Sequence, residues 1–384
     1  MSGPDPLDLH KLRVFPLAER NSLCRVEEIL VDPDAPAIAC SDPVAAAAKR
    51  AAADIVAARK RAAAVMLIYG AHLLRNGAAL IVERMLAGGW ITHLATNGAG
   101  TIHDWEFAWL GRSTECVRTN VAAGSFGTWD ETGRWINLAV LAGGLRTEGY
   151  GQSLGRFIIE DGLTLPDHDS LARLIRDEPA SPLTPARAEM LVAMRAHSLM
   201  AGRQDVIHRW KQASILAQAF RHGVPLSVHP GIGYDIISNH PLFCGGAIGR
   251  AAEVDFRLFG SAVERLDGGV VLSIGSAIMG PQVFEKSLSC VNNLRRQANR
   301  PIVSGHSIHV VDLQDGGGWD WTRGEPPKTN PAYYLRFCKS FSRMGGTMRY
   351  VQSDNLVFVH RVWQELRGMT KDEIPNDERM TKHE

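Results

Sequence analysis

The sequence predicts a doubly wound α/β fold, in which a mostly parallel β-sheet carries helices on both faces. Short apolar runs alternate with helix-like segments along most of the chain, which is the pattern of such a fold. A helix pattern at 77–87 separates apolar runs at 65–70 and 90–95; strand, helix and strand within about 30 residues form a βαβ unit with parallel pairing. Glycine-containing loops follow three predicted strands, at 97–100, 231–233 and 275–277.

The remaining elements follow in the order that this fold requires. Residues 1–41 contain five prolines, at positions 4, 6, 16, 33 and 36, and we expect them to form an irregular N-terminal arm before a single α/β domain at 42–384. Ser41, Asp42 and Pro43 are typical of a helix start, and the alanine-rich sequence to residue 64 favours a long helix. Further helices are predicted to begin at 104 and to span 186–200, 206–221, 252–266 and 282–295, with strands at 224–228, 269–274 and 301–303.

Composition excludes several classes of protein. The 384 residues carry 42 basic and 41 acidic side chains, for a net charge of +1, so no global field attracts nucleic acid or a membrane surface. No apolar run reaches the ~20 residues of a membrane helix. The six cysteines form no C-x-x-C pair and suit buried thiols in a reducing compartment. The N-terminus has no basic and apolar leader pattern. We therefore expect a cytoplasmic protein with no nucleic-acid or membrane partner.

The glycine loops are the first candidates for chemistry. Ligands of open parallel sheets bind outside the carboxyl ends of the strands, and glycine lets a phosphate approach exposed backbone N–H groups. A single strand-end glycine more often marks a tight turn, and none of the loops has the spacing of a dinucleotide fingerprint or a Walker loop. Three such loops at successive strand ends nevertheless favour a nucleotide-type site.

Two further features carry potential chemistry. Fourteen histidines include His103, His229 and His240 near the loops, but their spacing matches no zinc motif, so we expect no metal site. Acids and aromatic residues surround Lys339 between 310 and 339; such surroundings suit a cationic amine, and an apolar environment would favour the neutral, nucleophilic form of the lysine. On periodicity alone, Lys339 also fits a solvated helix lysine.

These motifs resemble the deoxyhypusine synthase family, especially its bacterial branch, over roughly residues 60–345. The family's strand-end loops and their order match those of this chain, and its nucleophilic lysine lies eight residues after a proline, as Lys339 does after Pro331. The resemblance implies a Rossmann-like sheet that binds NAD, a small-molecule amine substrate and a homo-oligomer, a tetramer in the family.

Family roles transfer to individual residues of this chain. The resemblance implies Lys339, His240 and Asp235 as catalytic residues, with Asp235 binding the substrate ammonium. The implied cofactor-binding residues are His72, Asn76, Thr96, Asn97, Gly98, Ala99, Gly100, Asp104, Gly231, Gly275 and Ser276. Pro230, Pro281, Tyr333 and Phe337 depart from the family pattern, which indicates that the polyamine half of the site has changed more than the cofactor half.

We therefore predict an NAD-dependent transferase that moves an aminoalkyl group between amines through a lysine imine. Two alternatives remain open at this stage. One is an NAD-dependent amine or amino-acid deaminase or cyclodeaminase in which Lys339 has no role. The other is an NAD-binding protein without catalytic activity, because similarity of fold does not fix function.

Overall fold

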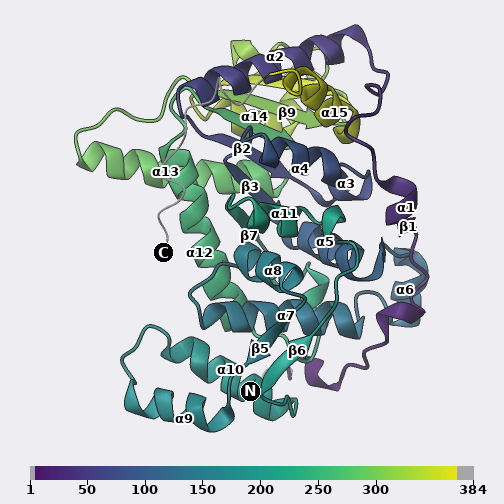
Figure 1. Cartoon of the computed structure of the whole chain (residues 1–384). Helices are drawn as coiled ribbons and strands as arrows, with labels where there is room; N and C mark the ends of the chain where they lie inside the picture. The colour runs from purple at the N-terminus through teal and green to yellow at the C-terminus, as the bar shows by residue number, and fades with distance from the viewer. Residues whose placement is uncertain (1–4, 370–384) are drawn as a thin grey trace.

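The computed structural model describes residues 5–369 and confirms the predicted α/β class. Six parallel strands form one sheet in the order β10-β9-β8-β2-β3-β7. The chain runs outward from β2 through β3 to β7, returns to β8 beside β2, and continues outward to β10 (Figure 1). This is the strand order of a doubly wound, Rossmann-type sheet, whose switch point lies between β2 and β8. The strands are β2 (Val65–Tyr69), β3 (His93–Asn97), β7 (Leu226–His229), β8 (Val270–Ile274), β9 (Ser307–Asp312) and β10 (Thr347–Gln352).

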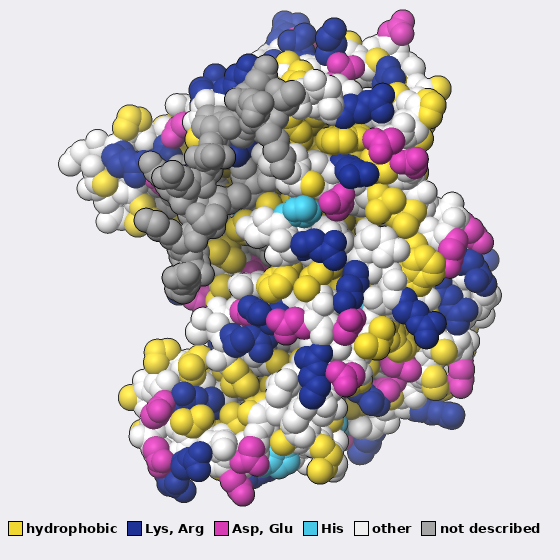
Figure 2. All heavy atoms as spheres, viewed as in Figure 1, with side chains coloured by type: hydrophobic (Ala, Val, Ile, Leu, Met, Phe, Trp, Pro, Cys, Tyr) yellow, Lys and Arg dark blue, Asp and Glu magenta, His cyan; other side chains and the backbone are white. Residues whose placement is uncertain are grey.

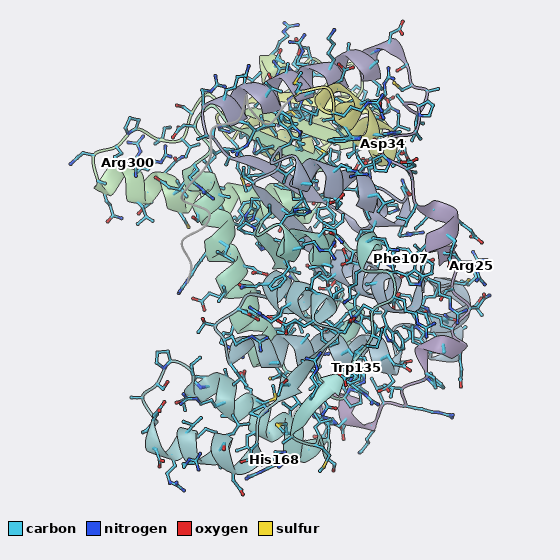
Figure 3. All side chains as sticks on the ribbon, viewed as in Figure 1. Arg25, Asp34, Phe107, Trp135, His168 and Arg300 are labelled. Atoms are coloured by element: carbon cyan, nitrogen blue, oxygen red, sulfur yellow. The ribbon has the colours of Figure 1, made fainter. Side chains whose placement is uncertain are left out.

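Alternating side chains bury both faces of the sheet. Val65, Leu67 and Tyr69 of β2 pack in one apolar cluster with helices α2 (Asp42–Lys60), α4 (Ala79–Ala87) and α15 (Asn355–Leu366). Met66 and Ile68 face the opposite cluster, formed with α12 (Gly245–Glu264), α13 (Met279–Gln297) and α14 (Arg336–Ser342). All five residues of β2 are buried, as expected of a central parallel strand covered on both faces. Arg300, just beyond α13, lies at the far end of a helix that projects from the molecule (Figure 3).

A largely helical insertion connects β3 to β7 and extends away from the sheet (Figure 1). Its helices are α5 (Gly98–Leu110), α6 (Val117–Ala123), α7 (Asp130–Gly144), α8 (Tyr150–Ile159), α9 (His168–Asp177), α10 (Thr184–Ala196) and α11 (Ile215–Arg221). Strands β5 (Gly162–Leu165) and β6 (Gly202–Asp205) pair antiparallel within it. The glycines at 149–155, which look irregular in sequence, lie at and within α8, where a Cβ on Gly151 would approach Leu226 O within 1.8 Å. Close helix–strand packing therefore explains them.

The N-terminal arm is irregular where it is described. Residues 5–41 contain two 3-10 turns, the four-residue helix α1 (Val26–Ile29) and strand β1 (Cys24–Arg25), which pairs with β4 (Arg112–Ser113). The division into an arm and one domain stays a prediction. No helix in residues 5–369 combines the length and apolarity needed to cross a bilayer. On the face drawn in Figure 2, basic and acidic side chains are interspersed.

Three sequence-based expectations for the elements are wrong, and two elements were not predicted. The helix expected at 206–221 begins only at Ile215, after the 3-10 turn Lys211–Ala213. The glycine stretch 98–100 is the first turn of α5, capped by the Asn97 side chain, which accepts from Gly100 N–H at 2.9 Å. Asparagine is a strong N-cap, and it starts the helix six residues before Asp104. Residues 301–303 form no strand, and β9 begins at Ser307 instead. Strand β10 and helix α15 were not predicted, because Thr347–Gln352 mixes polar and apolar residues at an edge of the sheet.

A buried carboxylate joins three parts of the fold. Asp255 of α12 is fully buried, and its Oδ2 accepts from the N–H groups of Gly151 at 3.0 Å and Val228 at 2.8 Å. It thereby fastens the start of α8 and strand β7 to α12. Burial raises the pKa of Asp255 to about 7, although the backbone hydrogen bonds oppose that rise.

Asp255→Ala should lower the free energy of unfolding by about 2 kcal/mol or more, because it leaves two buried N–H groups without an acceptor, each costing about 1–3 kcal/mol. Chemical denaturation measures the change. Glu253→Ala on the same helix is the control, since its exposed ion pair with Arg257 is worth only about 0.5 kcal/mol. Equal effects of the two substitutions would contradict the fastening role.

Candidate functional site

Two pairs of strand-end loops meet at the carboxyl edge of the sheet. At the switch point, Gly70 after β2 packs on Gly275 after β8; a Cβ on Gly70 would lie 2.2 Å from Gly275 O. Gly275 has φ +60°, and a Cβ there would meet the Asn355 side chain at 2.3 Å. One strand further along, Gly98 lies against Asp235, and a Cβ on Gly98 would come 2.0 Å from its carboxylate. The glycines therefore permit contact between loops.

Asp235 is held at the N-terminus of α5. It is 3% exposed, and its Oδ2 accepts from Gly231 N–H at 2.7 Å. Burial raises the pKa of Asp235 to about 6, while the N–H groups of Gly231 and Ala99 oppose that rise. Among the described residues, its Oδ1 has no hydrogen-bond partner although it is buried. An unpaired buried oxygen of this kind indicates a place for a donor that the chain itself does not supply.

A cavity of about 320 Å³ opens beside this carboxylate. Its polar wall carries Asp235, Arg75, Glu115, His103 and the pair Arg20–Glu106. Apolar atoms of Ile102, Val117, Phe126 and Ile236, with Tyr234 at the side, form the remainder. The cavity lies between the start of α5, the loop after β7, and the segment before α6. Its size suits a small molecule of amino-acid dimensions.

The charges around the cavity do not all have partners within the chain. Arg75, at the end of α3 (Ala71–Arg75), has a buried Nε that lacks an acceptor among residues 5–369. Glu115 accepts from two neutral donors, Trp129 Nε1 at 2.9 Å and Asn120 Nδ2 at 2.5 Å. In the described chain, no cation forms an ion pair with Glu115 or Asp235. The cavity thus presents two uncompensated carboxylates and one uncompensated guanidinium.

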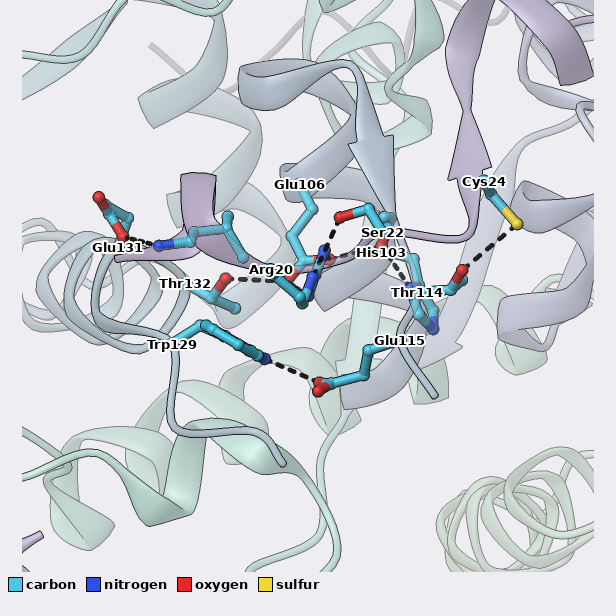
Figure 4. A network of polar contacts seen from close by, with 12 residues as sticks. Arg20, Ser22, Cys24, His103, Glu106, Thr114, Glu115, Trp129, Glu131 and Thr132 are labelled. Carbon is cyan, nitrogen blue, oxygen red and sulfur yellow. Dashed lines mark hydrogen bonds and ion pairs between the residues drawn. The ribbon is translucent and has the colours of Figure 1, made fainter. Parts of the chain in front are cut away.

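A buried network closes one side of the cavity (Figure 4). Arg20 of the N-terminal arm donates to both oxygens of Glu106, at 2.8 and 2.7 Å. Ser113 and Thr132 donate to the same carboxylate, at 2.5 and 2.8 Å. Burial raises the pKa of Glu106, but the Arg20 charge and the hydrogen bonds from Arg20 and Ser113 lower it by more. The pKa of Glu106 therefore lies below its ordinary value. The pair is therefore internally compensated, and it fixes the arm over α5.

His103 belongs to this network and is neutral there. Its Nδ1 lies 2.7 Å from Ser113 Oγ. Burial lowers the pKa of His103 to about 4, and the charges of Arg75 and Arg20 lower it further. A neutral imidazole adds no charge to the cavity wall at pH 7.

The predicted cofactor residues divide into groups at this edge. Asn76 donates to Asp354 Oδ2 at 3.2 Å, beside the switch point. Ser276 Oγ accepts from Gly280 N–H at 3.1 Å, at the start of α13. His72 lies on α3 between the switch point and the cavity.

Thr96 donates to Tyr69 O at 3.0 Å, and a Cβ on Gly100 would meet the same threonine, so this part of the segment 96–100 is used for packing. Gly98, Ala99 and Gly231 surround Asp235.

The acid predicted to bind cofactor has a structural role. Asp104 is fully buried and accepts from the Ser214 hydroxyl and from Ile215 N–H at 2.8 Å. Burial raises the pKa of Asp104 to about 7. Because Asp104 sits in the middle of α5 rather than in a loop, its side chain points into the insertion, where it caps α11. Both carboxylate oxygens of Asp104 are thus engaged in structural hydrogen bonds, and its contact with a cofactor stays a prediction.

Two of the three predicted catalytic residues lie apart from the cavity. His240 Nε2 is 3.3 Å from Asp130 Oδ1, and its Nδ1 accepts from Leu242 N–H; it packs on α7, where a Cβ on Gly133 would strike its ring. Lys339 Nζ is 3.1 Å from Glu325 and 3.4 Å from the Tyr333 ring centroid. The hydrogen bond to Tyr333 and the Glu325 charge raise the pKa of Lys339. This is the opposite of the neutral lysine that an imine requires.

Comparisons with known proteins give no family for the chain. No family model matches it, and no curated protein matches it. Among solved structures, it is similar to unliganded AgrE, with 13% identity over 87% of this chain and 34% of AgrE and a TM-score of 0.42. A ternary complex of AgrE with ornithine and NAD+ shows 14% identity and a TM-score of 0.41. The chain spans about a third of the length of AgrE.

Two further solved structures show the same level of similarity. ArgZ, an arginine dihydrolase from the ornithine-ammonia cycle in cyanobacteria, has 12% identity over 85% of this chain and 33% of ArgZ, with a TM-score of 0.39. A putative LOR/SDH protein from Methanococcus maripaludis S2 has 15% identity over 93% of this chain and 74% of that protein, with a TM-score of 0.39. At these identities and TM-scores, the similarities do not assign an activity to this chain.

The resemblance to the deoxyhypusine synthase family is wrong. The solved structures that the chain resembles are AgrE, ArgZ and the LOR/SDH protein, and no family model supports the deoxyhypusine synthase assignment. The transferase activity and its lysine imine fall with it, since Lys339 is ion-paired away from the cavity. The spacing of Pro331 and Lys339 is instead that of a 3-10 turn, Pro331–Tyr334, followed by α14.

Sequence reasoning missed Arg75 and Glu115. Arg75 lies between His72 and Asn76, which were selected, and a charged residue inside that segment was a detectable signal. Glu115 offered none, because only the folded insertion brings the segment before α6 beside α5. No group of three or more His, Cys, Asp or Glu side chains in residues 5–369 is arranged to hold a metal ion.

Glu106→Gln should destabilise the protein by about 3–5 kcal/mol, because it leaves the buried Arg20 guanidinium without its counter-charge. Thermal or urea unfolding followed by circular dichroism provides the measurement. Glu27→Gln on the exposed side of α1 is the matched control and should change stability by less than about 0.5 kcal/mol. A loss below about 1 kcal/mol for Glu106→Gln would show that the ion pair does not hold the arm.

Proposed function

We propose that the protein is an NAD-dependent deaminase or cyclodeaminase of an amino acid that carries a second amino group. One observation carries this proposal: a single cavity is lined by Asp235 and Arg75, each with a buried side-chain atom that lacks a hydrogen-bond partner, and by Glu115, whose carboxylate has no cationic partner in the described chain. Two ammonium groups and one carboxylate on a ligand would compensate all three charges. Amino-acid deamination was one of the alternatives left open by the sequence.

Ornithine is a suitable probe for this charge pattern, because it carries two amino groups and one carboxylate. It is also the ligand that accompanies NAD+ in the ternary complex of AgrE. For this chain, the charge pattern of the cavity supports the substrate class, and the Rossmann-type strand order supports a dinucleotide. A cytosolic location, self-association and a small-molecule amine partner remain predictions.

The switch point fits part of a dinucleotide. Asn355 Oδ1 is buried there without a partner in the described chain, beside Gly275, where a side chain would not fit. His72, Asn76, Gly275, Ser276 and Asn355 are the residues that would hold NAD. When bound, NAD would accept a hydride from the carbon that carries the amino group. In a deaminase water would then displace ammonia and NADH would be released, whereas in a cyclodeaminase the second amino group would displace ammonia and the hydride would return to that carbon.

The cavity residues would position the amino acid for that reaction. Arg75 would bind the substrate carboxylate, and Glu115 the distal ammonium. Asp235 would bind the ammonium on the reacting carbon. With its pKa at about 6, Asp235 is ionised at pH 7 but close enough to neutrality to take the proton that the amino group releases, which is the range expected of a general base. Ile102, Phe126 and Ile236 limit the access of water.

Asp235→Asn should weaken binding of L-ornithine by about 1.5–3 kcal/mol, the value of a hydrogen bond to a charged group. In the wild-type protein, affinity should also fall as the pH drops below about 6, because protonation removes the carboxylate charge; the variant should lack that dependence. Calorimetry between pH 5 and 8 gives both results. Asp169→Asn on the exposed side of α9 is the control and should bind as the wild type does. If Asp235→Asn binds L-ornithine with the affinity and the pH profile of the wild type, Asp235 is not the ammonium partner.

A matched ligand series tests the charge count. Norvaline lacks the second amino group of ornithine, and putrescine lacks its carboxylate. Each should bind at least about tenfold more weakly than ornithine to the wild-type protein, because one cavity charge stays uncompensated. Glu115→Gln should remove the preference over norvaline, and Arg75→Gln the preference over putrescine. Equal affinities for all three ligands would refute the assignment of a diamino acid.

Lys339→Arg should keep turnover within about twofold of wild type, because Arg preserves the ion pair with Glu325 and the lysine does not line the cavity. Steady-state kinetics with NAD and the diamino acid supply the measurement. Loss of turnover with an unchanged melting temperature would place the lysine in the reaction after all.

A further inference from the structure

A second cavity lies at the opposite edge of the sheet, away from the proposed active site. It measures about 520 Å³ and opens over the edge strand β10. Helix α2 contributes Arg50, β9 contributes His309, β10 contributes Arg349 and Tyr350, and the segment before and within the 3-10 turn Trp321–Arg323 contributes residues 319–322. It shares no lining residue with the cavity at Asp235.

Three buried polar atoms around this second cavity lack hydrogen-bond partners in the described chain. Trp321 is 2% exposed, and its indole Nε1–H has no acceptor. Arg349 Nη1 makes no hydrogen bond, and His309, which is fully buried, has an unpartnered Nδ1. The neighbouring Trp319 differs, because its Nε1 donates to Gly324 O at 2.9 Å. Leaving a buried donor unsatisfied is costly, so the Trp321 indole N–H and Arg349 Nη1 in one cavity indicate a missing acceptor, whereas His309 Nδ1 is an acceptor when its Nε2–H donates to Asp54.

The charges at the cavity favour an anion as that acceptor. Asp54 beneath it is already engaged, 2.9 Å from His309 Nε2 and 3.7 Å from Arg349 Nη1. Asp320, the acid in the wall, accepts from the Thr322 N–H and hydroxyl at 3.0 and 2.7 Å. Arg50 on the exposed side of α2 adds a second guanidinium. Asp54 is thus shared between His309 and, at a longer distance, Arg349, and the groups that can still donate to an anion are Arg349, Arg50 and the Trp321 indole.

We propose that this cavity is a binding site for a small organic oxyanion, a carboxylate or a phosphate ester, separate from the proposed active site. Arg349 and Trp321 N–H would donate to the oxyanion, with Arg50 at the entrance. The rings of Trp319, Trp321 and Tyr350 would contact the apolar body of the ligand. Strand β10 leads directly into Asp354 and α15, and Asp354 and Asn355 lie beside Asn76 and Gly275 at the switch point.

The indole N–H signals of the protein labelled with nitrogen-15 at its tryptophans provide a direct test. Trp321→Phe identifies the Trp321 signal by its loss among the nine tryptophans. Titration with succinate and, separately, inorganic phosphate should shift that signal; a response to succinate alone identifies a carboxylate site, and a response to phosphate alone a phosphate site. Tetramethylammonium is the cationic probe and should leave the signal unchanged.

Arg349→Gln should weaken binding of the effective anion by about tenfold or more, as expected when a charged donor is removed. Arg343→Gln, at the C-cap of α14 with 61% of its side chain exposed, is the control and should bind as wild type. Melting temperatures of the variants equal to that of the wild type exclude unfolding as the cause of weaker binding. Trp321→Phe, which keeps an aromatic ring but lacks the indole N–H, should also weaken binding when it is measured by calorimetry. A Trp321 signal unmoved by both anions at millimolar concentration, a shift caused by tetramethylammonium instead, or unchanged affinity in Arg349→Gln would each overturn the proposal.

Discussion

The contact between Asp235 and the first turn of α5 is the constraint on which the proposed site depends. It brings the loop after β7 onto the helix after β3, so two adjacent strand ends form one wall. Only a glycine at position 98 allows the carboxylate to approach so closely. The same contact takes Asp235 out of water, raises its pKa to about 6, and leaves its buried Oδ1 without a donor in the described chain beside the cavity. Fold and candidate chemistry thus share a single interaction.

The chain manages its other buried charges differently, and the difference distinguishes structural from available groups. Glu106 is buried, but Arg20, Ser113 and Thr132 compensate it. Asp104 and Asp255 are fully buried, accept from backbone N–H groups that fasten helices, and have pKa values that burial raises to about 7. Asp235, Glu115 and Arg75 differ in that they line one cavity and form no ion pair within the described chain. Uncompensated groups of opposite sign in one cavity are what a ligand with both charges requires.

The sequence predicted the fold well because periodicity and glycine placement report local structure. The runs at 65–70 and 269–274 became β2 and β8, and the loops after β3 and β7 do meet. It failed where tertiary context decided the outcome. Asn97 starts α5 earlier than Asp104 suggests, so Asp104 turns inward. The eight-residue spacing before Lys339 fits a turn and a helix as well as a nucleophile motif, and its partner Glu325 could not be inferred from spacing. Glu115 reaches the cavity only through the folding of the long insertion.

The central claim is that the cavity beside Asp235 removes an amino group from a diamino acid with the help of NAD. Release of labelled ammonia from L-ornithine carrying nitrogen-15 at its α-amino group tests this claim most directly. The account predicts labelled ammonia from the wild-type protein in the presence of NAD, and none when NAD is omitted or when Asp235 is replaced by Asn. Failure to release labelled ammonia from either ornithine or lysine by the folded, NAD-supplemented protein would contradict it, as would release that proceeds equally well without NAD.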